Sequence, residues 1–384
     1  MRLLLAGGGH SHIEVLRQLG RERDAALAVT LVTPEPAAAY SGMLPGLVAG
    51  LYRREETEIP LAPLARAAGA RIVRDRVTAL DLAARTATLG DGDALPFDVV
   101  SLDVGSTPDA GIPGAREHAM RVKPVPALLE AWERLQQDAR EGRVRTIAIV
   151  GGGAGGVEIL LAMQHRLRAA MGSAAPRFAL VSDQPHVLPQ HSPAVRRLAG
   201  RVLAERDVVL HFGSAARAVE RNAVVLEGGR RIAADAIVWA TSAAAAPWLA
   251  ASGLGTDARG FVCVDDHLRS VSHPFVFAAG DCATLASHRH PKSGLYAVRH
   301  GPPLATNLLA HAHGRRLQPY RPQPRGLALI GTGDRAAILS WGPLAAKGRW
   351  VWRWKERIDR AFVARYTVPG DPATGASAEV ARED

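Results

Sequence analysis

Two short apolar runs in the chain end in glycine-rich turns, and each continues into a segment with helical periodicity. The first is LLLAGGGHSHIEVL (residues 3–16) and the second is IAIVGGGAGGVEIL (147–160). A short apolar run closed by glycines is typical of a buried strand, and the spacing of apolar residues after it is that of an amphipathic helix. The sequence therefore predicts the same strand–turn–helix unit at two places.

The similarity between the two units extends beyond their turns. VTLVTPE (29–35) corresponds to FALVSDQ (178–184), and FDVVSLDVGS (97–106) corresponds to ADAIVWATSA (234–243). Three matches in the same order indicate an internal duplication. Strand and helix patterns alternate around each turn, so we expect an α/β protein with two Rossmann-like, doubly wound dinucleotide-binding domains.

Length and composition limit the classes of protein to consider. A chain of 384 residues with 47% hydrophobic residues can bury more than one core. Polar residues and a proline interrupt the most apolar stretch (236–251), so we expect no transmembrane helix. The apolar run at the N-terminus is too short for a signal peptide, and a cytoplasmic protein is expected.

Cysteine content and charge narrow the candidate partners. Cys263 and Cys282 are the only cysteines, too few and too far apart for a disulfide framework or a metal cluster. The formal net charge of +10 comes almost wholly from arginine in an alanine-rich chain, and we do not take it as evidence of nucleic-acid binding. We expect neither a metal site nor a nucleic-acid partner.

The glycines of each turn match a dinucleotide fingerprint. Backbone N–H groups at a helix N-terminus bind a diphosphate where no side chain blocks the approach. In the second turn Gly151, Gly153 and Gly156 fill all three positions, and Glu158 follows two residues later. In the first turn Gly7 and Gly9 fill two positions.

His12 occupies the third position of the first turn. The third glycine mainly permits close packing of helix on strand, so a histidine there alters packing more than phosphate binding. An imidazolium is disfavoured at a helix N-terminus without an anion beside it. Either His12 pairs with the diphosphate, or it is a buried histidine that fills space between helix and strand.

The acidic residues that usually bind the ribose also differ from the pattern. The expected positions at the end of the second strand read Thr33 and Ser182, with Glu35 and Asp183 close behind. The ribose anchors are either shifted to these acids or replaced by hydroxyls. The choice between NAD and NADP stays open.

A third motif lies near the C-terminal part. FVFAAGDCATL (275–285) is an apolar strand that ends at Gly280 and Asp281. Together with the two fingerprints, it resembles the flavin motif of the pyridine nucleotide-disulfide oxidoreductase superfamily. The strand-exit motif of that superfamily corresponds here to Asp103-Val104-Gly105, with a departure at Asp103.

This resemblance implies the cofactors and the domain order. Asp281 would hydrogen-bond the ribityl chain of FAD, the first fingerprint would bind the ADP half of FAD, and the second would bind NAD(P)H. The NAD(P)H domain is then inserted into the FAD domain, because Asp281 must return to the domain of Gly7. We expect an FAD-binding domain (1–120 and 256–345), an NAD(P)H-binding domain (121–255), an amphipathic segment (346–368) and a disordered tail (369–384).

Two further motifs narrow the resemblance to the type II NADH dehydrogenases. YSGMLPGLVAG (40–50), with Pro45, looks like their flavin-side loop, and KSGLYAVRHG (292–301) resembles their quinone-side helix. His300 stands where those enzymes commonly carry glutamine. GGGHSH and SGMLPG together resemble more closely a subgroup fused to, or encoded near, selenide, water dikinase.

The chemistry implied does not use a redox-active disulfide, because the sequence has no CxxC or similar pair. Hydride would pass from NAD(P)H to the flavin, and electrons would leave to a quinone-like acceptor. Lys292 either offsets negative charge near the flavin or is a surface lysine. Glu158 positions the nicotinamide, relays a proton or complements the helix dipole, and His300 either protonates a quinone or is structural.

The segment 346–368 has the pattern of an amphipathic helix. Its apolar arc consists of Trp350, Val351, Trp354, Ile358, Ala361 and Phe362. Residues 345–366 hold seven basic and two acidic side chains, a local charge of +5. Such a helix suits peripheral contact with the inner face of an anionic membrane, and packing on the protein's own core or in a homodimer is the alternative.

Three functions are compatible with these observations. The leading hypothesis is an FAD-dependent NAD(P)H dehydrogenase that reduces a quinone-like acceptor. The second is a soluble NAD(P)H-dependent reductase in selenium or sulfur metabolism. The third is a nucleotide-binding flavoprotein that acts as a redox sensor or scaffold, suggested by the departures at Asp103, Thr33 and Ser182.

Overall fold

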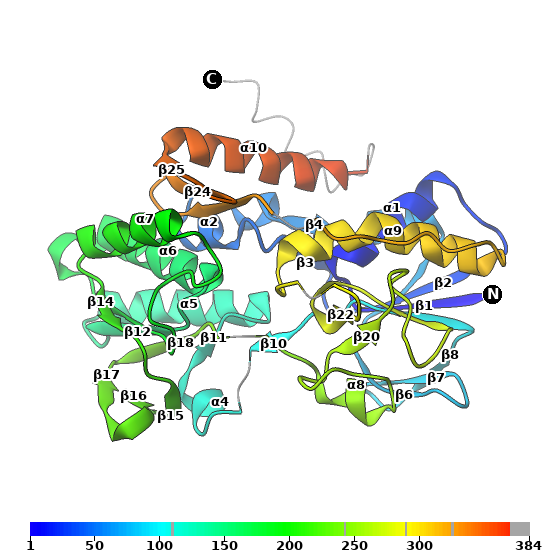
Figure 1. Ribbon diagram of the computed structural model, residues 1–384, viewed down its shortest axis with the longest axis horizontal. Coiled ribbons are helices and arrows are strands. Elements are labelled where there is room, and N and C mark those ends of the chain that lie inside the picture. The colour runs from blue at the N-terminus through cyan, green and yellow to red at the C-terminus, as the bar shows by residue number, and fades with distance from the viewer. Residues whose placement is uncertain (109–110, 242, 289, 324–325, 369–384) are drawn as a thin grey trace.

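The computed structural model describes residues 1–108, 111–241, 243–288, 290–323 and 326–368. It confirms the expected α/β class, because two five-stranded parallel sheets lie side by side and are covered by helices (Figure 1). The expected disordered tail, 369–384, lies outside the described residues.

The first sheet has the strand order β21-β9-β1-β2-β5. Its strands are β1 (Arg2–Ala6), β2 (Ala28–Val32), β5 (Arg71–Val73), β9 (Val99–Leu102) and β21 (Val276–Ala278). Residues 3–6 are all buried, as expected for a strand covered on both faces. The helices of this domain are α1 (His10–Arg21), α3 (Leu61–Ala68) and α9 (Gly294–Ala312).

The second sheet has the order β11-β18-β12-β13-β14. Its strands are β11 (Met120–Arg121), β12 (Thr146–Val150), β13 (Arg177–Val181), β14 (Val209–His211) and β18 (Ala236–Trp239). Its helices are α5 (Val125–Arg140), α6 (Ala154–Met171) and α7 (Pro193–Glu205). The corresponding strands β9-β1-β2-β5 and β18-β12-β13-β14 stand in the same order, which supports the internal duplication.

A three-stranded antiparallel sheet accompanies each parallel sheet. One consists of β6 (Val77–Asp81), β7 (Thr86–Leu89) and β8 (Ala94–Pro96), and the other of β15 (Ala216–Glu220), β16 (Ala223–Leu226) and β17 (Arg231–Ala233). The duplication therefore includes the antiparallel parts of the two domains as well as their parallel sheets.

The second domain is inserted into the first. The chain leaves the first sheet after β9 and returns to it at β21, which pairs with β9 in parallel. Where it leaves and returns, β10 (Thr107–Pro108) pairs with β19 (Ala243–Ala244). The remaining short elements are β3 (Ala37–Ala39), α2 (Leu44–Val48), η1 (Arg54–Glu56), β4 (Glu58–Pro60), α4 (Ala115–His118), η2 (Gly172–Ala174), η3 (Glu227–Gly229), α8 (Pro247–Ala251), β20 (Val262–Val264), η4 (Gly280–Cys282) and β22 (Ala283–Leu285).

A C-terminal layer covers one side of both domains. It consists of the antiparallel strands β23 (Ala328–Gly331), β24 (Ala337–Trp341) and β25 (Leu344–Gly348), followed by helix α10 (Arg349–Arg365). The sheet packs on α6 and α7, and α10 runs above both domains (Figure 1). None of the helices described is long and apolar enough to cross a membrane.

The structure corrects the apolar arc predicted for this helix. Val351 and Phe362 are buried, whereas Trp350, Trp354 and Ile358 are 54%, 39% and 41% exposed, and Ala361 is exposed as well. The buried side of α10 consists of Val351, Trp352, Lys355, Asp359 and Phe362. The periodicity misplaced this face because the helix buries an ion pair between Lys355 and Asp359, so charge does not mark its solvent side.

Candidate functional site

Both fingerprint turns have the backbone that only glycine adopts readily. Gly7 has φ +96° and Gly151 has φ +130°. A Cβ at Gly7 would overlap the carbonyl oxygen of Asp103, and a Cβ at Gly151 would overlap that of Ala240. Each first glycine thus lets the turn pass directly against the corresponding strand exit of its own domain.

The two turns present unpaired backbone donors at a helix N-terminus. Among the residues described, none accepts a hydrogen bond from the N–H groups of Gly8, Gly9 and His10, which open α1. At α6 the N–H groups of residues 152–156, from Gly152 to Gly156, likewise have no acceptor there. Such donors, together with the helix dipole, form an anion site of the kind that holds a diphosphate.

His12 is engaged within the protein. Its Nδ1 lies 2.6 Å from the carbonyl oxygen of Gly7 and its Nε2 lies 2.8 Å from the hydroxyl of Ser101. The carbonyl can only accept, so Nδ1 carries the proton and Nε2 accepts from Ser101. Burial lowers the pKa of His12 to about 4, so the ring is neutral. This geometry favours the packing alternative over pairing with a diphosphate.

Hydroxyls occupy the ribose position of both domains. Thr33 and Ser182 are buried at the ends of β2 and β13, and each hydroxyl accepts the N–H of the residue two positions on. The Thr33 and Ser182 hydroxyls lie 2.9 Å and 2.7 Å from where a Cβ would stand on Gly8 and Gly152. Glu35 and Asp183 come close after these hydroxyls and are more exposed, Asp183 most of all. Asp183 directly follows Ser182, and Glu35 is the second residue after Thr33.

Gly280 and Asp281 come next to the first fingerprint, as the sequence predicted for a discontinuous site. Gly280 has φ +63° and Gly105 has φ +69°, and a Cβ on Gly280 would overlap the carboxylate of Asp103. Asp281 is only 13% exposed and accepts hydrogen bonds from Lys123 at 2.8 Å and from Ser106 at 3.0 Å. Although burial opposes ionisation, Lys123 and Ser106 hold the pKa of Asp281 below its ordinary value.

Lys292 was singled out from the sequence, whereas Lys123, which contacts Asp281, was missed. The Nζ of Lys292 donates to the carbonyl of Ala283 and to the hydroxyl of Thr284, and it stands 4.2 Å from the centre of the Phe261 ring. Burial lowers its pKa. The cation that contacts Asp281 is Lys123, from the connection between the domains. The scarcity of lysine in this arginine-rich chain was the one signal that marked it.

His300 is buried on α9 and faces the Gly280 turn. Its Nδ1 accepts the N–H of Gly280 at 3.0 Å, which places the ring proton on Nε2. That Nε2 is buried and has no partner among the residues described. Burial, with a smaller effect from His290, lowers the pKa of His300 to about 3. The ring is therefore a neutral hydrogen-bond donor, and an imidazolium acid at this position is disfavoured.

Glu158 meets the flavin-side loop through the C-terminal layer. Its carboxylate accepts the N–H of Gly331 on β23 at 2.7 Å. Lys355 donates to the carbonyl of Gly42 at 2.6 Å and to Asp359 at 2.7 Å. Burial raises the pKa of Glu158 to about 7, and Lys355 opposes that rise. Pro45 is the second residue of α2, in the same loop. A proton can thus be held at Glu158 near neutral pH.

The two cysteines offer no thiol relay. Neither forms a disulfide, and Cys282 is buried with its thiol directed at the carbonyls of Leu102 and Ala279. Burial raises the pKa of Cys282 to about 12, so it is a thiol rather than a thiolate at neutral pH. Electron transfer through a cysteine pair is not supported by this arrangement.

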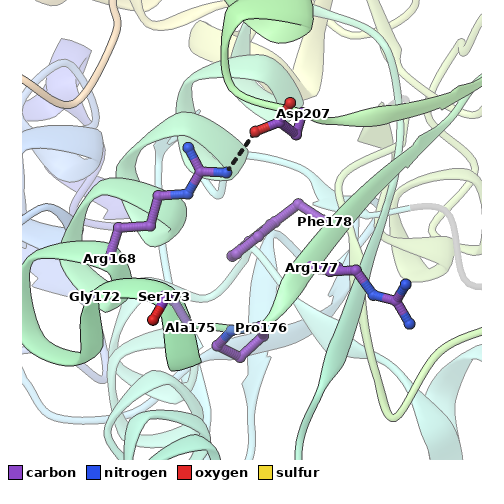
Figure 2. Close-up of a pocket in the computed structure, with 8 residues that line it drawn as sticks. All are labelled: Arg168, Gly172, Ser173, Ala175, Pro176, Arg177, Phe178 and Asp207. Atoms are coloured by element: carbon purple, nitrogen blue, oxygen red, sulfur yellow. Dashed lines mark hydrogen bonds and ion pairs between the residues drawn. The ribbon is translucent and has the colours of Figure 1, made fainter.

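A surface pocket of about 510 Å³ lies beside the second parallel sheet. It is lined by Arg168, Ser173, Arg177 and Asp207 among others (Figure 2). Arg177 begins β13, so this pocket lies at the amino end of the strand. Ligands of open parallel sheets bind at the carboxyl ends, where both glycine turns lie, and we assign this pocket no nucleotide.

The match to known proteins agrees with this geometry. The family model described as pyridine nucleotide-disulphide oxidoreductase matches residues 1–307. NADH dehydrogenase-like protein MT1860 of Mycobacterium tuberculosis (strain CDC 1551 / Oshkosh) is 28% identical over 253 residues, 64% of this chain and 63% of that protein, so the match spans under two thirds of that relative. Demethylphylloquinone reductase NdbB of Synechocystis sp. is 23% identical over 355 residues, 88% of this chain and 86% of that protein.

Solved structures show the same fold. NDH2 from Plasmodium falciparum in complex with NADH superposes with a TM-score of 0.81 at 12% identity, over 97% of this chain and 99% of that chain. One dinucleotide-binding domain inserted into another, with a Gly-Asp turn returning to the first, defines a class of oxidoreductases with two nucleotide sites. The chain belongs to the pyridine nucleotide-disulphide oxidoreductase family, whose cofactors are FAD and NAD(P)H.

The residues present fit these cofactors. The glycine turns leave space that a Cβ would fill, their backbone donors have no acceptor among the described residues, and Asp281 stands beside the first turn with its carboxylate ionised. Asp103 departs from this fit, because it places a second carboxylate at the N-terminus of α1. Thr33 and Ser182 depart as well, because they stand where acidic ribose anchors are usual.

Proposed function

We propose that this protein is an NAD(P)H dehydrogenase that reduces a quinone-like acceptor without a redox-active disulfide. FAD is assigned to the turn at Gly7 and Gly9, with Asp281 on its ribityl chain, and NAD(P)H to the turn at Gly151. When bound, FAD supplies the chemistry that accepts hydride from NAD(P)H and returns electrons to the acceptor. The observation that carries the proposal is the pair of glycine cradles in a chain whose Cys282 thiol is buried and protonated.

The chain's own residues bind, orient and supply protons. Lys123 keeps Asp281 ionised and places positive charge beside the flavin site, where negative charge develops on reduction. Glu158 holds a proton near neutral pH, and Lys355 sets how readily it is released. His300 offers the N–H of its Nε2 as a neutral donor to an acceptor oxygen. Reduction of a quinone by NAD(P)H takes up one proton besides the hydride, and Glu158 can hold that proton while His300 only donates a hydrogen bond, so no thiol is needed.

A lipid-soluble acceptor fits the exposed side of α10. Trp350, Trp354 and Ile358 follow one another at helical spacing and are exposed, with Arg353 and Arg357 exposed between them. Tryptophan and arginine on one helix face suit the headgroup region of an anionic membrane. We therefore propose a cytoplasmic protein attached peripherally to the membrane, and a homodimer through the same face is the competing arrangement.

Flavin reduction in a stopped-flow instrument tests the proposal. The FAD-loaded protein mixed with NADH or NADPH without oxygen should lose its oxidised-flavin absorbance rapidly, and a short-chain quinone should restore it. Asp281→Ala should lower flavin content, because a buried ribityl hydrogen bond is lost. Lys347→Met, on the exposed surface, serves as the matched control for Lys123→Met, which should slow reduction. If neither nucleotide bleaches the flavin, the proposed dehydrogenase activity is wrong and a redox sensor or scaffold becomes the better hypothesis.

Selenium or sulfur species are the second candidate acceptors, motivated by the GGGHSH and SGMLPG motifs. Turnover with quinones and with such species in one preparation distinguishes the two functions. Because the Cys282 thiol is buried and protonated, Cys282→Ser should leave quinone reduction unchanged. Faster turnover with a selenium or sulfur species, lost in Cys282→Ser, would favour the soluble reductase linked to that metabolism.

A further inference from the structure

The first nucleotide turn contains an anion of its own. Asp103, at the exit of β9, accepts the N–H of Ser11 at 2.8 Å and the N–H of His12 at 3.2 Å. Its side chain is almost completely buried. These donors belong to the second and third residues of α1, and the helix dipole favours a negative charge there. A carboxylate therefore occupies part of the anion site that the glycine turn builds.

The duplicated domain shows the same site without the anion. Ala240 stands where Asp103 stands, because each passes its carbonyl oxygen against the first glycine of its own turn. The N–H groups of Gly155 and Gly156, which correspond to those of Ser11 and His12, have no acceptor among the described residues. The carboxylate is thus an addition to the first domain and is not required by the turn itself.

Space around Asp103 is limited. A Cβ on Gly9 or on Gly280 would overlap its carboxylate, so two glycines of the flavin motifs make room for it. Asp281, the other carboxylate of the site, lies close enough to raise the pKa of Asp103. A diphosphate at the N-terminus of α1 would add further negative charge beside a group that cannot move away.

Titration of Asp103 is governed mainly by its surroundings in the protein. Burial raises its pKa to about 7, while the N–H groups of His12 and Ser11 oppose the rise. His12 is neutral and directed at Gly7, so it supplies no charge. The titratable or charged groups on the elements around the carboxylate include His10 and His12 on α1, Asp281 and Cys282 on η4, His300 on α9 and Lys123 on the domain connection.

We propose that Asp103 competes with the FAD diphosphate for the N-terminus of α1, so that FAD binding is coupled to the uptake of one proton by the Asp103 carboxyl. The inference rests on the assignment of FAD to the first turn. Protonation removes the repulsion between carboxylate and diphosphate and leaves Asp103 a neutral group in the same place. Bound FAD in turn favours the protonated carboxyl, because the two equilibria are linked.

The sign of the pH dependence follows from this linkage. Below the pKa of free Asp103, about 7, the carboxyl is already neutral and FAD affinity is constant. Above it, the free protein must take up a proton to bind FAD, so affinity falls about tenfold per pH unit until the pKa of the FAD complex is reached. The enzyme would therefore retain its flavin in neutral or acidic surroundings and release it as the pH rises.

Titration of flavin-free protein with FAD between about pH 6 and about pH 9 tests this linkage. Asp103→Asn keeps the shape and an acceptor oxygen without the charge, and Asp103→Ala installs the residue of the second domain. Both should bind FAD at least about tenfold more tightly than the unaltered protein at the alkaline end, with little change across the range. In weak buffer near pH 8, the protein should take up close to one proton for each FAD molecule that it binds. The Asp103→Asn variant should take up fewer protons for each FAD bound.

Asp98→Asn is the matched control, because Asp98 directly precedes β9 but pairs at the surface with Arg2. It should keep the pH dependence of the unaltered protein, and circular dichroism should confirm that all variants fold. Equal FAD affinity at every pH in the unaltered protein, or weaker binding by Asp103→Asn at alkaline pH, would overturn the coupling. Asp281→Ala distinguishes failure of the proton coupling from failure of the FAD assignment. If this variant binds FAD as tightly as the unaltered protein, the assignment of FAD to the first turn is wrong.

Discussion

At the scale of single residues, the first domain carries a set of polar substitutions that satisfy one another. His12, Ser101 and Asp103 stand where the second domain has Gly156, Val238 and Ala240. The His12 ring forms hydrogen bonds with the Gly7 carbonyl and the Ser101 hydroxyl, and the backbone N–H of His12 donates to the Asp103 carboxylate. A buried polar group costs free energy unless it has a hydrogen-bond partner. The three positions are therefore polar together in the first domain and without polar side chains together in the second.

His12→Gly, which installs the residue of the second domain, tests this dependence. It removes two buried hydrogen bonds and leaves the Ser101 hydroxyl unpaired, so we expect the free energy of unfolding to fall by about 1–3 kcal/mol. Adding Ser101→Val should recover part of the lost stability, because the hydroxyl left without the His12 ring is then replaced by an apolar side chain. Chemical denaturation measures both effects. Flavin content should be unchanged, and its loss in a normally stable variant would show that the ring contacts the cofactor.

At the scale of elements, helix α10 has apolar residues on two sides, one packed on the protein and one exposed. Phe362 stacks on Tyr40 with ring centres 4.3 Å apart, and Trp352 stacks on Tyr52 at 5.9 Å. The helix therefore belongs to the fold, and a truncation before it would uncover these rings. Trp354, on the opposite side, is 39% exposed and free to meet a membrane or a second subunit.

One substitution on each side of α10 separates these roles. Phe362→Ala should lower the free energy of unfolding by about 3–5 kcal/mol, because a buried ring leaves a cavity. Trp354→Ala should change it by about 0.5 kcal/mol or less, yet weaken sedimentation with anionic vesicles. Neutral vesicles and raised salt should weaken binding of the unaltered protein as well. A change of oligomeric state in Trp354→Ala, with vesicle binding intact, would favour the homodimer.

At the scale of the whole molecule, the C-terminal layer contacts both domains, and it does so at equivalent positions of the duplicated sequence. Glu14 and Glu158 occupy the same position after the two fingerprints. Glu14 accepts the hydroxyl of Tyr366 at 3.0 Å, directly after α10, and Glu158 accepts the N–H of Gly331 on β23. The C-terminal layer thus connects the two domains through the helices that follow their glycine turns.

Lys355→Met tests the ionic part of this connection. It leaves Asp359 and Glu158 buried without their cation, so the free energy of unfolding should fall by about 3–5 kcal/mol. The exposed pair of Lys347 and Glu205 provides the control, and Lys347→Met should cost about 1 kcal/mol or less. Because Glu158 has a pKa of about 7, the effect should be larger above neutral pH, where the carboxylate is charged. Equal losses from both variants would contradict this account.

Local patterns were sufficient to predict the duplicated strands and the glycine turns, whereas the insertion of one domain into the other was implied by the family resemblance. The strands and turns follow from short-range chemistry: apolar runs form buried strands, and glycine alone fits the turns at Gly7 and Gly151. The motif around Asp281 also predicted its return to the first sheet, which the pairing of β21 with β9 bears out.

Tertiary structure alone decided which charges meet. Lys123 and Asp281 are 158 residues apart, and Glu158 meets the C-terminal layer through Gly331, 173 residues away. The face of α10 was misread for the same reason, since Lys355 and Asp359 pair with each other in the interior instead of with water. A single sequence records the polarity of each side chain, whereas burial and partners that shift its pKa come from segments that only folding brings together.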